Sequence, residues 1–260
     1  MKLELFQVDA FTNKVFGGNP AAVCPLDEWL PDSTLQNIAI ENNLSETAYF
    51  VKEGDAFHLR WFTPGGEVDL CGHATLATAY TLFNELGYPD KTITFTGRSG
   101  NLYVHRTENG MTMDFPLWPR KKIQTPEIIT RALGKTPLAF FSGYDAMAVF
   151  EHPEDIRNMQ PDFHLLKQFE TRGLLITAPG DKDYDFISRA FFPRLEINED
   201  PVTGSAHCLL APYWADRLSK TTLKAHQAST RGGDLLCTIK GDRLNITGQA
   251  ILYLQGSINV

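Results

Sequence analysis

Glu46 stands in a segment that reads as a buried β-strand, where a carboxylate is unexpected. Alternation along residues 45–51 places Glu46 on the same face as Ala48 and Phe50, and that face is apolar. Burial of a charged carboxylate is costly, and a desolvated carboxyl group can take up and return a proton near neutral pH. Glu46 is therefore a candidate general acid and base. The alternative is a residue at the end of a strand that points into solvent.

Three further titratable residues lie near two glycines. Cys71 and His73 flank Gly72, and Asp200 shortly precedes Gly204. A helix start lowers the pKa of a nearby thiol such as Cys71, and an imidazole can act as an acid or a hydrogen-bond donor. Asp200 can orient a substrate amine or hydroxyl, or share protons with His73. The alternatives are an inert thiol, a surface histidine and a helix-capping aspartate.

Gly72-His73 and Gly204-Ser205 begin two segments, 72–86 and 204–218, that we predict to be buried helices because they are apolar nearly all round. The first turn of a helix has unpartnered N–H groups and favours an anion, and glycine lets a ligand approach the backbone. We predict that both helix starts bind a small carboxylate, with Ser205 as a further donor. Alternatively, the glycines only open tightly packed helices and Ser205 is a cap.

The chain contains an internal repeat. Residues 60–69 match residues 189–198 at an offset of 129, and the segment from Cys71 matches that from Thr203 at an offset of 132. We place the three additional residues around Glu199-Asp200-Pro201. The repeat predicts two homologous domains, 1–117 and 118–260, packed about an approximate two-fold axis with the two helix starts facing across a cleft. The counterpart of Glu46 is then aliphatic, either Leu175 or Ile176.

The local patterns predict a mixed α/β fold in which each half is a strand-rich sheet or barrel wrapped around one central helix. Prolines near residues 116–126 indicate the linker, and the basic run that starts at Arg120 reads as a solvated loop there. Besides the two central helices, we predict a helix over 32–42 and strands over 3–10, 20–25, 45–51, 56–63, 92–96, 100–106, 110–115, 173–179, 184–192, 222–228, 233–239 and 243–248.

Composition excludes several classes of protein. A chain of 260 residues with 43% hydrophobic residues can bury a large core and is not globally disordered. Its net charge of −7 argues against nucleic-acid and anionic-membrane partners. The four cysteines form no C-x-x-C pair, so a structural zinc site has no support. With no signal-peptide or membrane-helix pattern, we expect a soluble cytoplasmic protein.

Four motifs together resemble the PhzF-like isomerase family of phenazine-biosynthesis-like proteins. They are FxVDAFTxxxFxGNPAAV over 6–23, LSETAYFV over 44–51, RWFTPxxEVDLCGHATLA over 60–77 and EDPVTGSAHCxLAPYW over 199–214. The resemblance implies the diaminopimelate-epimerase fold, with two similar domains and the active site between them. It also implies a homodimer, no metal and no organic cofactor. The family name suggests an aromatic amino-acid precursor, such as a dihydro-hydroxyanthranilate, as the kind of substrate.

The resemblance assigns roles residue by residue. Glu46 corresponds to the carboxylate that moves a proton between two carbons of the substrate, assisted by His73 and Asp200. Gly72, Gly204 and Ser205 correspond to the carboxylate-binding helix starts, and Asn19 to an asparagine on the substrate side. Related epimerases and proline racemases use two cysteines, whereas here Cys71 is matched by Thr203. One carboxylate that acts on one face of the substrate fits this sequence better.

The leading hypothesis is therefore a cofactor-independent isomerase that moves a proton or double bond in a small carboxylate. A second hypothesis is a thiol enzyme with Cys71 as nucleophile and His73 as base, although residues two apart near a helix start need not face each other. A third is a non-catalytic small-molecule binder. A fourth is metal binding by Cys71, His73, His207 and Cys208, which is disfavoured because adjacent helical residues point in different directions.

Overall fold

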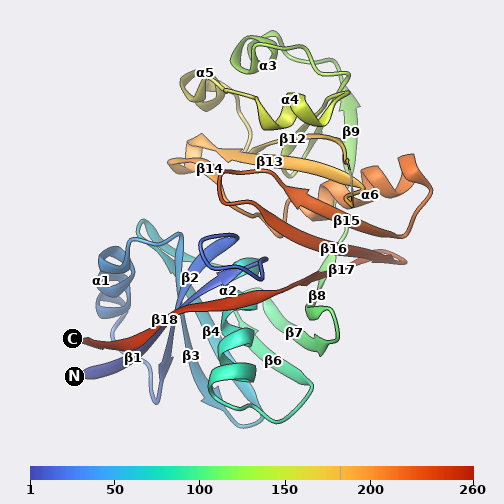
Figure 1. Cartoon of the computed structure of the whole chain (residues 1–260). Coiled ribbons are helices and arrows are strands. Elements are labelled where there is room, and N and C mark those ends of the chain that lie inside the picture. The colour runs from blue at the N-terminus through green and yellow to red at the C-terminus, as the bar shows by residue number, and fades with distance from the viewer. Residues whose placement is uncertain (182) are drawn as a thin grey trace. The chain divides into compact units, whose positions relative to one another are not determined.

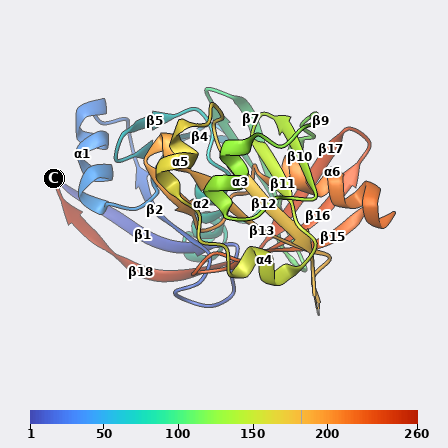
Figure 2. The same cartoon turned by 90° about the horizontal axis from the view of Figure 1, so that it is seen from above.

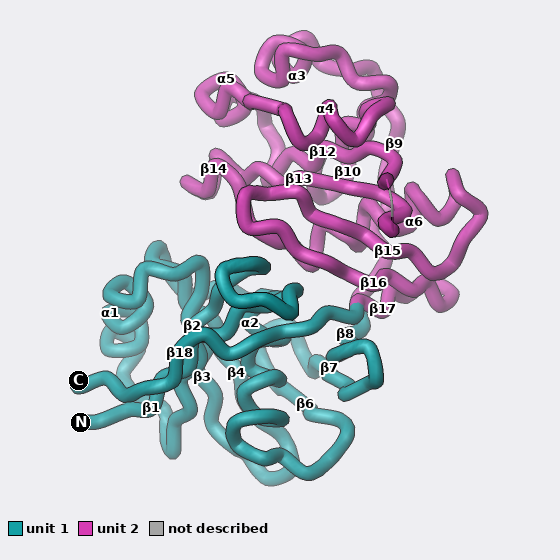
Figure 3. Tube along the Cα trace, viewed as in Figure 1, with its two compact units in different colours: residues 1–114, 247–260 teal, residues 115–246 magenta. Residues whose placement is uncertain are grey.

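The computed structural model describes residues 1–181 and 183–260, which form two compact units (Figure 3). Unit 1 comprises Met1–Asp114 and Thr247–Val260, and unit 2 comprises Phe115–Ile246. The chain passes from unit 1 to unit 2 within the strand Gly110–Pro116 and returns within the strand Arg243–Gly248. Both units are mixed α/β and rich in strands, which is the predicted fold class.

Unit 1 is built on a sheet with the strand order β18, β1, β2, β3, β4, β6, β7, β8, and β5 also pairs with β4. The β2–β3 and β4–β6 pairs are parallel and the others antiparallel. The elements are β1 (Lys2–Ala10), β2 (Asn19–Leu26), α1 (Asp32–Asn42), β3 (Glu46–Glu53), β4 (Ala56–Thr63), β5 (Gly66–Val68), α2 (Gly72–Tyr80), a π-helical turn (Thr81–Glu85), β6 (Thr92–Gly97), β7 (Gly100–Thr107), β8 (Gly110–Pro116) and β18 (Ala250–Asn259).

Unit 2 repeats these pairings with the strand order β9, β10, β11, β12, β13, β15, β16, and β14 pairs with β13. Here β11–β12 and β13–β15 are the parallel pairs. The elements are β9 (Arg120–Ile123), α3 (Glu127–Leu133), β10 (Ala139–Gly143), β11 (Ala146–Val149), α4 (Pro153–Arg157), α5 (Phe163–Gln168), β12 (Leu174–Pro179), β13 (Phe186–Phe192), a 3₁₀ turn (Pro193–Leu195), β14 (Ile197–Asp200), α6 (His207–Leu218), β15 (Thr222–Gln227), β16 (Gly233–Lys240) and β17 (Arg243–Gly248).

The last strand of the chain, β18, belongs to unit 1 although the strands before it form unit 2, and β9 has the equivalent place in the sheet of unit 2. Strand β18 pairs with β1, so the two chain ends lie side by side in Figure 1, and β9 pairs with β10 in the same way. Both strands cover a sheet edge that would otherwise present unpaired backbone groups. The predicted domain 118–260 is therefore wrong in its last residues, which belong to unit 1. The predicted solvated loop at Arg120 is also wrong, because its residues form β9.

The sequence repeat is in register over β4 and β13 but shifts after them. An arginine of each strand makes a bidentate ion pair with a glutamate: Arg60 Nε lies 2.7 Å from Glu67 Oε1, and Arg189 Nε lies 2.6 Å from Glu199 Oε1. The counterpart of Glu67 is therefore Glu199, not the glutamate matched at offset 129. The three additional residues lie between Pro193 and Glu199, where the chain forms the 3₁₀ turn Pro193–Leu195, so the insertion that we placed around Asp200 lies earlier in the chain.

Helix α2 is buried because it is apolar on nearly every face, as predicted. It packs against β1, β2, β3 and β18 (Figures 1 and 2), and residues 73–79 are all buried. Its buried threonines are satisfied locally, because the hydroxyls of Thr75, Thr78 and Thr81 donate to carbonyls four residues earlier. The helices are short, α6 having 12 residues, and no helix of the described residues has the length and apolar character needed to cross a membrane.

Each sheet carries helices on its second face as well. Helix α1 has the bounds that the sequence predicts, and it is anchored by the hydroxyl of Tyr49, which donates to the carbonyl of Leu35 at 2.7 Å. In unit 2, α3, α4 and α5 enclose a core with Leu174 and Ile176 of β12. Thr177, which follows Ile176, faces α6 instead, because its Oγ1 accepts a hydrogen bond from Trp214 Nε1. Alternation along β12 thus separates two layers of helices.

Candidate functional site

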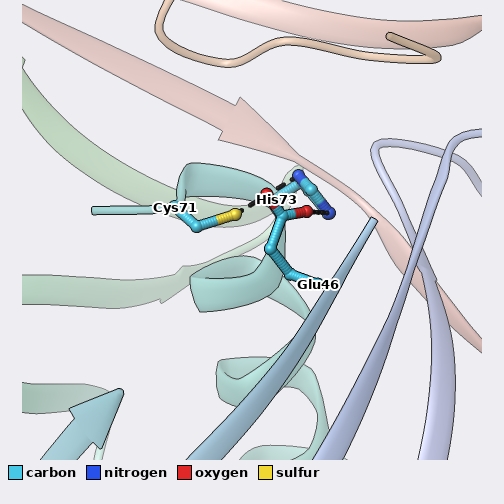
Figure 4. Close-up of side chains that lie close together, drawn as sticks. All are labelled: Glu46, Cys71 and His73. Atoms are coloured by element: carbon cyan, nitrogen blue, oxygen red, sulfur yellow. Dashed lines mark hydrogen bonds and ion pairs between the residues drawn. The ribbon is translucent and has the colours of Figure 1, made fainter. Parts of the chain in front are cut away.

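Glu46, Cys71 and His73 come together in unit 1 (Figure 4). His73 Nε2 lies 3.0 Å from Glu46 Oε2, and His73 Nδ1 lies 3.5 Å from Cys71 Sγ. The side chains of His73 and Glu46 are only 7% and 15% exposed. A carboxylate, an imidazole and a thiol therefore share one nearly desolvated place at the start of α2.

The positions of these three residues follow from local structure. Glu46 is the first residue of β3, whose alternation turns Tyr49 and Val51 toward the core formed with α1 and leaves Glu46 on the face toward α2. Gly72 is the first residue of α2, as predicted. Cys71 precedes it with extended backbone angles of −141° and 112°, which turns its thiol back toward His73. Cys71 and His73 therefore face each other, although residues two apart near a helix start need not do so.

Asn19 joins this cluster from the first position of β2. Its side chain is fully buried, and its Nδ2 lies 3.3 Å from His73 Nδ1. Ser45 Oγ donates to Asn19 Oδ1 at 3.4 Å, a contact that the sequence analysis missed. In its neutral form, His73 accepts from the Asn19 amide at Nδ1 and carries its proton on Nε2, which faces Glu46.

Electrostatics divide the roles of these groups. Burial lowers the pKa of His73, but the negative charges of Cys71, when ionised, and of Glu46 outweigh this and hold it well above its ordinary value. Burial, followed by the charge of Glu46, raises the pKa of the Cys71 thiol, and His73 offsets this only in part. The predicted lowering by the helix start is therefore wrong, because the pKa of the Cys71 thiol is raised. A thiol that stays protonated is a weak nucleophile.

The Glu46–His73 contact leaves hydrogen-bonding capacity available. The two facing atoms are 3.0 Å apart, yet neither Glu46 Oε2 nor His73 Nε2 has an aligned hydrogen bond among the described residues. Buried polar atoms usually have such partners, and here the ion pair between these two atoms takes their place.

The same three side chains are the metal-ligand cluster that the described residues contain, with ligand atoms within 4.8 Å of one another. Within the cluster, Nδ1 of His73 faces Cys71 and Nε2 faces Glu46. Of the four residues in the metal hypothesis, His207 lies in unit 2, where its Nδ1 contacts the carbonyl of Thr203 and burial lowers its pKa to about 4.

The remaining predicted site residues lie in unit 2. Asp200 ends β14, and its Oδ2 accepts a hydrogen bond of 2.5 Å from Thr203 Oγ1. Gly204 and Ser205 do not begin the helix as predicted, because α6 starts at His207. They lie in a tight turn in which the N–H groups of residues 206, 207 and 208 donate to the carbonyls three residues earlier. The first N–H groups of α6 are therefore already hydrogen-bonded. The expected cleft between the two helix starts remains a prediction.

The counterpart of Glu46 in unit 2 is a glycine. Ala48 and Leu175 hold equivalent places opposite β4 and β13, so the residue equivalent to Glu46 is Gly173 rather than either of the aliphatic residues predicted. A Cβ at Gly173 would lie 2.2 Å from the ring of Phe192, so no side chain fits there. The site therefore has its buried carboxylate in one half of the repeat and backbone alone in the other.

Comparisons with known proteins agree with this fold. The family model for phenazine biosynthesis-like proteins, PhzC-PhzF, matches residues 8–256, and the chain belongs to this family. A Pseudomonas aeruginosa protein named an uncharacterized isomerase is 48% identical over the whole of both chains, and a second from that organism is 46% identical over the same span.

Solved structures extend the comparison to the fold. A PhzF-family phenazine biosynthesis protein from Enterococcus faecalis is 48% identical, covers all of both chains and superposes with a TM-score of 0.98. A hydroxyproline epimerase from Agrobacterium vitis, solved with trans-4-hydroxy-L-proline, is 11% identical, with a TM-score of 0.62 over 99% of this chain and 92% of its own. The predicted fold of the diaminopimelate-epimerase type is thereby confirmed.

Proposed function

We propose that this protein is a cofactor-independent isomerase that moves a proton between two carbon atoms of a small carboxylate substrate. The observation that carries the proposal is the asymmetry of the repeat. Glu46 is buried beside His73 in unit 1, whereas its counterpart is Gly173, and Cys71 is matched by Thr203. One half supplies a general base, and the other supplies neither a carboxylate nor a thiol at the equivalent positions.

In the proposed reaction, the Glu46 carboxylate removes a proton from a substrate carbon and the C–H electron pair shifts into the adjacent unsaturated system. The neutral Glu46 carboxyl then returns that proton to another carbon as the double bond moves. His73, facing Glu46 through Nε2, stabilises the carboxylate before and after the transfer. Backbone N–H groups at Gly72 and at the Gly204-Ser205 turn hold the substrate carboxylate, with Asn19 and Asp200 orienting its polar groups. No electron is gained or lost overall.

The test is solvent exchange at carbon. The protein is incubated in D₂O with a panel of small amino and unsaturated carboxylic acids that includes a dihydro-hydroxyanthranilate, and deuterium on carbon is followed by NMR and mass spectrometry. We expect exchange in the wild-type protein and its loss in Glu46→Gln. Glu53→Gln, at the exposed end of the same strand, is the matched control.

One observation favours a second candidate, a Cys71-dependent reaction, because its thiol touches His73. The raised pKa of the Cys71 thiol argues against this candidate. Full exchange in Glu46→Gln, combined with its loss in Cys71→Ala, would replace the proposed mechanism with the thiol mechanism.

A further inference from the structure

Gln227, the last residue of β15, has a fully buried side chain whose hydrogen bonds converge on one short segment of unit 2. Its Oε1 accepts from the backbone N–H of Thr203 at 2.9 Å, and its Nε2 donates to the carbonyl of Asp200 at 2.8 Å. One amide therefore ties together both ends of the segment 200–203. A buried amide needs such partners, and here its partners are the residues that flank a candidate catalytic group.

The same amide reaches the hydroxyl that holds the Asp200 carboxylate. Gln227 Nε2 lies 3.5 Å from Thr203 Oγ1, and Thr203 Oγ1 donates to Asp200 Oδ2 at 2.5 Å. The donors point in one direction, from Gln227 to Thr203 to Asp200. Thr203 is only 8% exposed, so this chain of bonds is nearly dry and its members strengthen one another.

Unit 1 has the same strand pairings without this chain of bonds. The pairings of β4 with β6 and of β13 with β15 correspond, which makes Gly97 the counterpart of Gln227. Trp61 faces Val68 as Ala190 faces Asp200, so Val68 is the counterpart of Asp200. Cys71 is the counterpart of Thr203. Unit 1 therefore lacks the glutamine, the threonine and the aspartate at these positions and still forms the same sheet, so the fold does not require these three side chains.

We propose that Gln227 and Thr203 are positioning residues that hold the Asp200 carboxylate in one orientation toward the substrate. This inference rests on the proposed function, because Asp200 acts only if the protein catalyses proton transfer. At the position where unit 1 has the Cys71 thiol, Thr203 has a hydroxyl that donates a hydrogen bond. The side-chain amide of Gln227 accepts one hydrogen bond and donates another, which keeps the segment 200–203 in place. Neither residue touches the reacting atoms in this account.

The first test is kinetic and uses the panel compound that the wild-type protein exchanges. We expect Thr203→Val and Gln227→Leu to lower kcat about 10- to 100-fold, the range that misplacement of a reacting group produces, with a smaller change in KM. Thr203→Ser keeps the hydroxyl and should retain most of the rate. The double variant should be no worse than the poorer single variant, because both break one chain of bonds. The exposed Gln168→Leu is the matched control.

The second test does not depend on turnover. The Thr203 amide should be protected from hydrogen exchange in the wild-type protein and lose that protection in Gln227→Leu. If the protection of the Thr203 amide is unchanged in Gln227→Leu, the proposed tie is overturned. The positioning role is overturned if Thr203→Val has the wild-type rate, or if Thr203→Ser is as slow as Thr203→Val. If Gln227→Leu does not fold, the comparison of Thr203→Val with Thr203→Ser tests the positioning role. If the wild-type protein exchanges no compound, the proposed function and the positioning role both fail, while the tie is still decided by amide protection.

Discussion

Gly173 is the residue on which the one-sided site depends, and Gly173→Ala tests it. The added Cβ would lie 2.2 Å and 2.4 Å from two ring carbons of Phe192 and 3.1 Å from Asp145 Oδ1. Carbon atoms pack at about 3.5–4.0 Å, so the ring must retreat by more than about 1 Å. Phe192 is 4% exposed and lies under the Arg172 guanidinium, 5.0 Å from its ring centre, which leaves little room for that movement.

We therefore expect Gly173→Ala to lower the free energy of unfolding by about 2–3 kcal/mol, the upper part of the range for overpacked cores. Urea denaturation, followed by circular dichroism, measures this difference. Gly65→Ala is the matched control, because its Cβ would meet only Thr63 Oγ1 at 3.6 Å. In a Phe192→Ala background the effect of Gly173→Ala should nearly disappear. A loss below about 0.5 kcal/mol, or an equal loss in both backgrounds, would refute the steric account of the missing second side chain.

Three further predictions concern titration. Because the pKa of Cys71 is raised, its alkylation by iodoacetamide should be slower than that of a free thiol at pH 7.5 and should rise with pH; fast labelling of Cys71 at neutral pH would contradict its protonated state. The NMR titration midpoint of His73 should lie above 6.5 and fall in Glu46→Gln, because that variant removes one of the charges that raise it; an unchanged midpoint would show that Glu46 does not act on His73. The pKa of His207 is about 4 against 6.5 when unfolded, so stability is complete above pH 6.5 and about 3 kcal/mol is lost as the pH falls to 4. His207→Leu should flatten that part of the urea-stability profile between pH 7 and pH 4, and an equally steep profile in the variant would contradict the assignment.

Local patterns predicted much of the fold. Helix α1 has the bounds that its sequence indicates, and α2 is buried because residues 74–79 are apolar or are threonines that bond within the helix. Apart from β18, the strands of 7 or more residues, such as β3 and β13, were predicted within two residues. The repeat was also found from sequence, because each half must encode the same sheet.

The missed elements are short or depend on distant partners. Strands β9 and β11 have 4 residues and α4 has 5, too few to show a period. Strand β18 was missed although it has 10 residues, since its assignment depends on pairing with β1 at the other end of the chain. The predicted start of α6 was too early, because residues 204 and 205 lie in a turn with hydrogen bonds between residues three apart and are not part of the helix.

What the sequence by itself determined is the set of chemical groups and the repeat that holds them, since residue types and local periods are written along the chain. It identified Glu46, His73, Cys71 and Asp200 as the groups able to move or hold protons. Only the tertiary structure decided their surroundings. The pairing of β12 with β13 made Gly173 the counterpart of Glu46, and the end of β15 brought Gln227 to Thr203. Strand register joins residues far apart in sequence, and a shift of one residue turns every side chain to the other face, so local pattern cannot determine which groups meet.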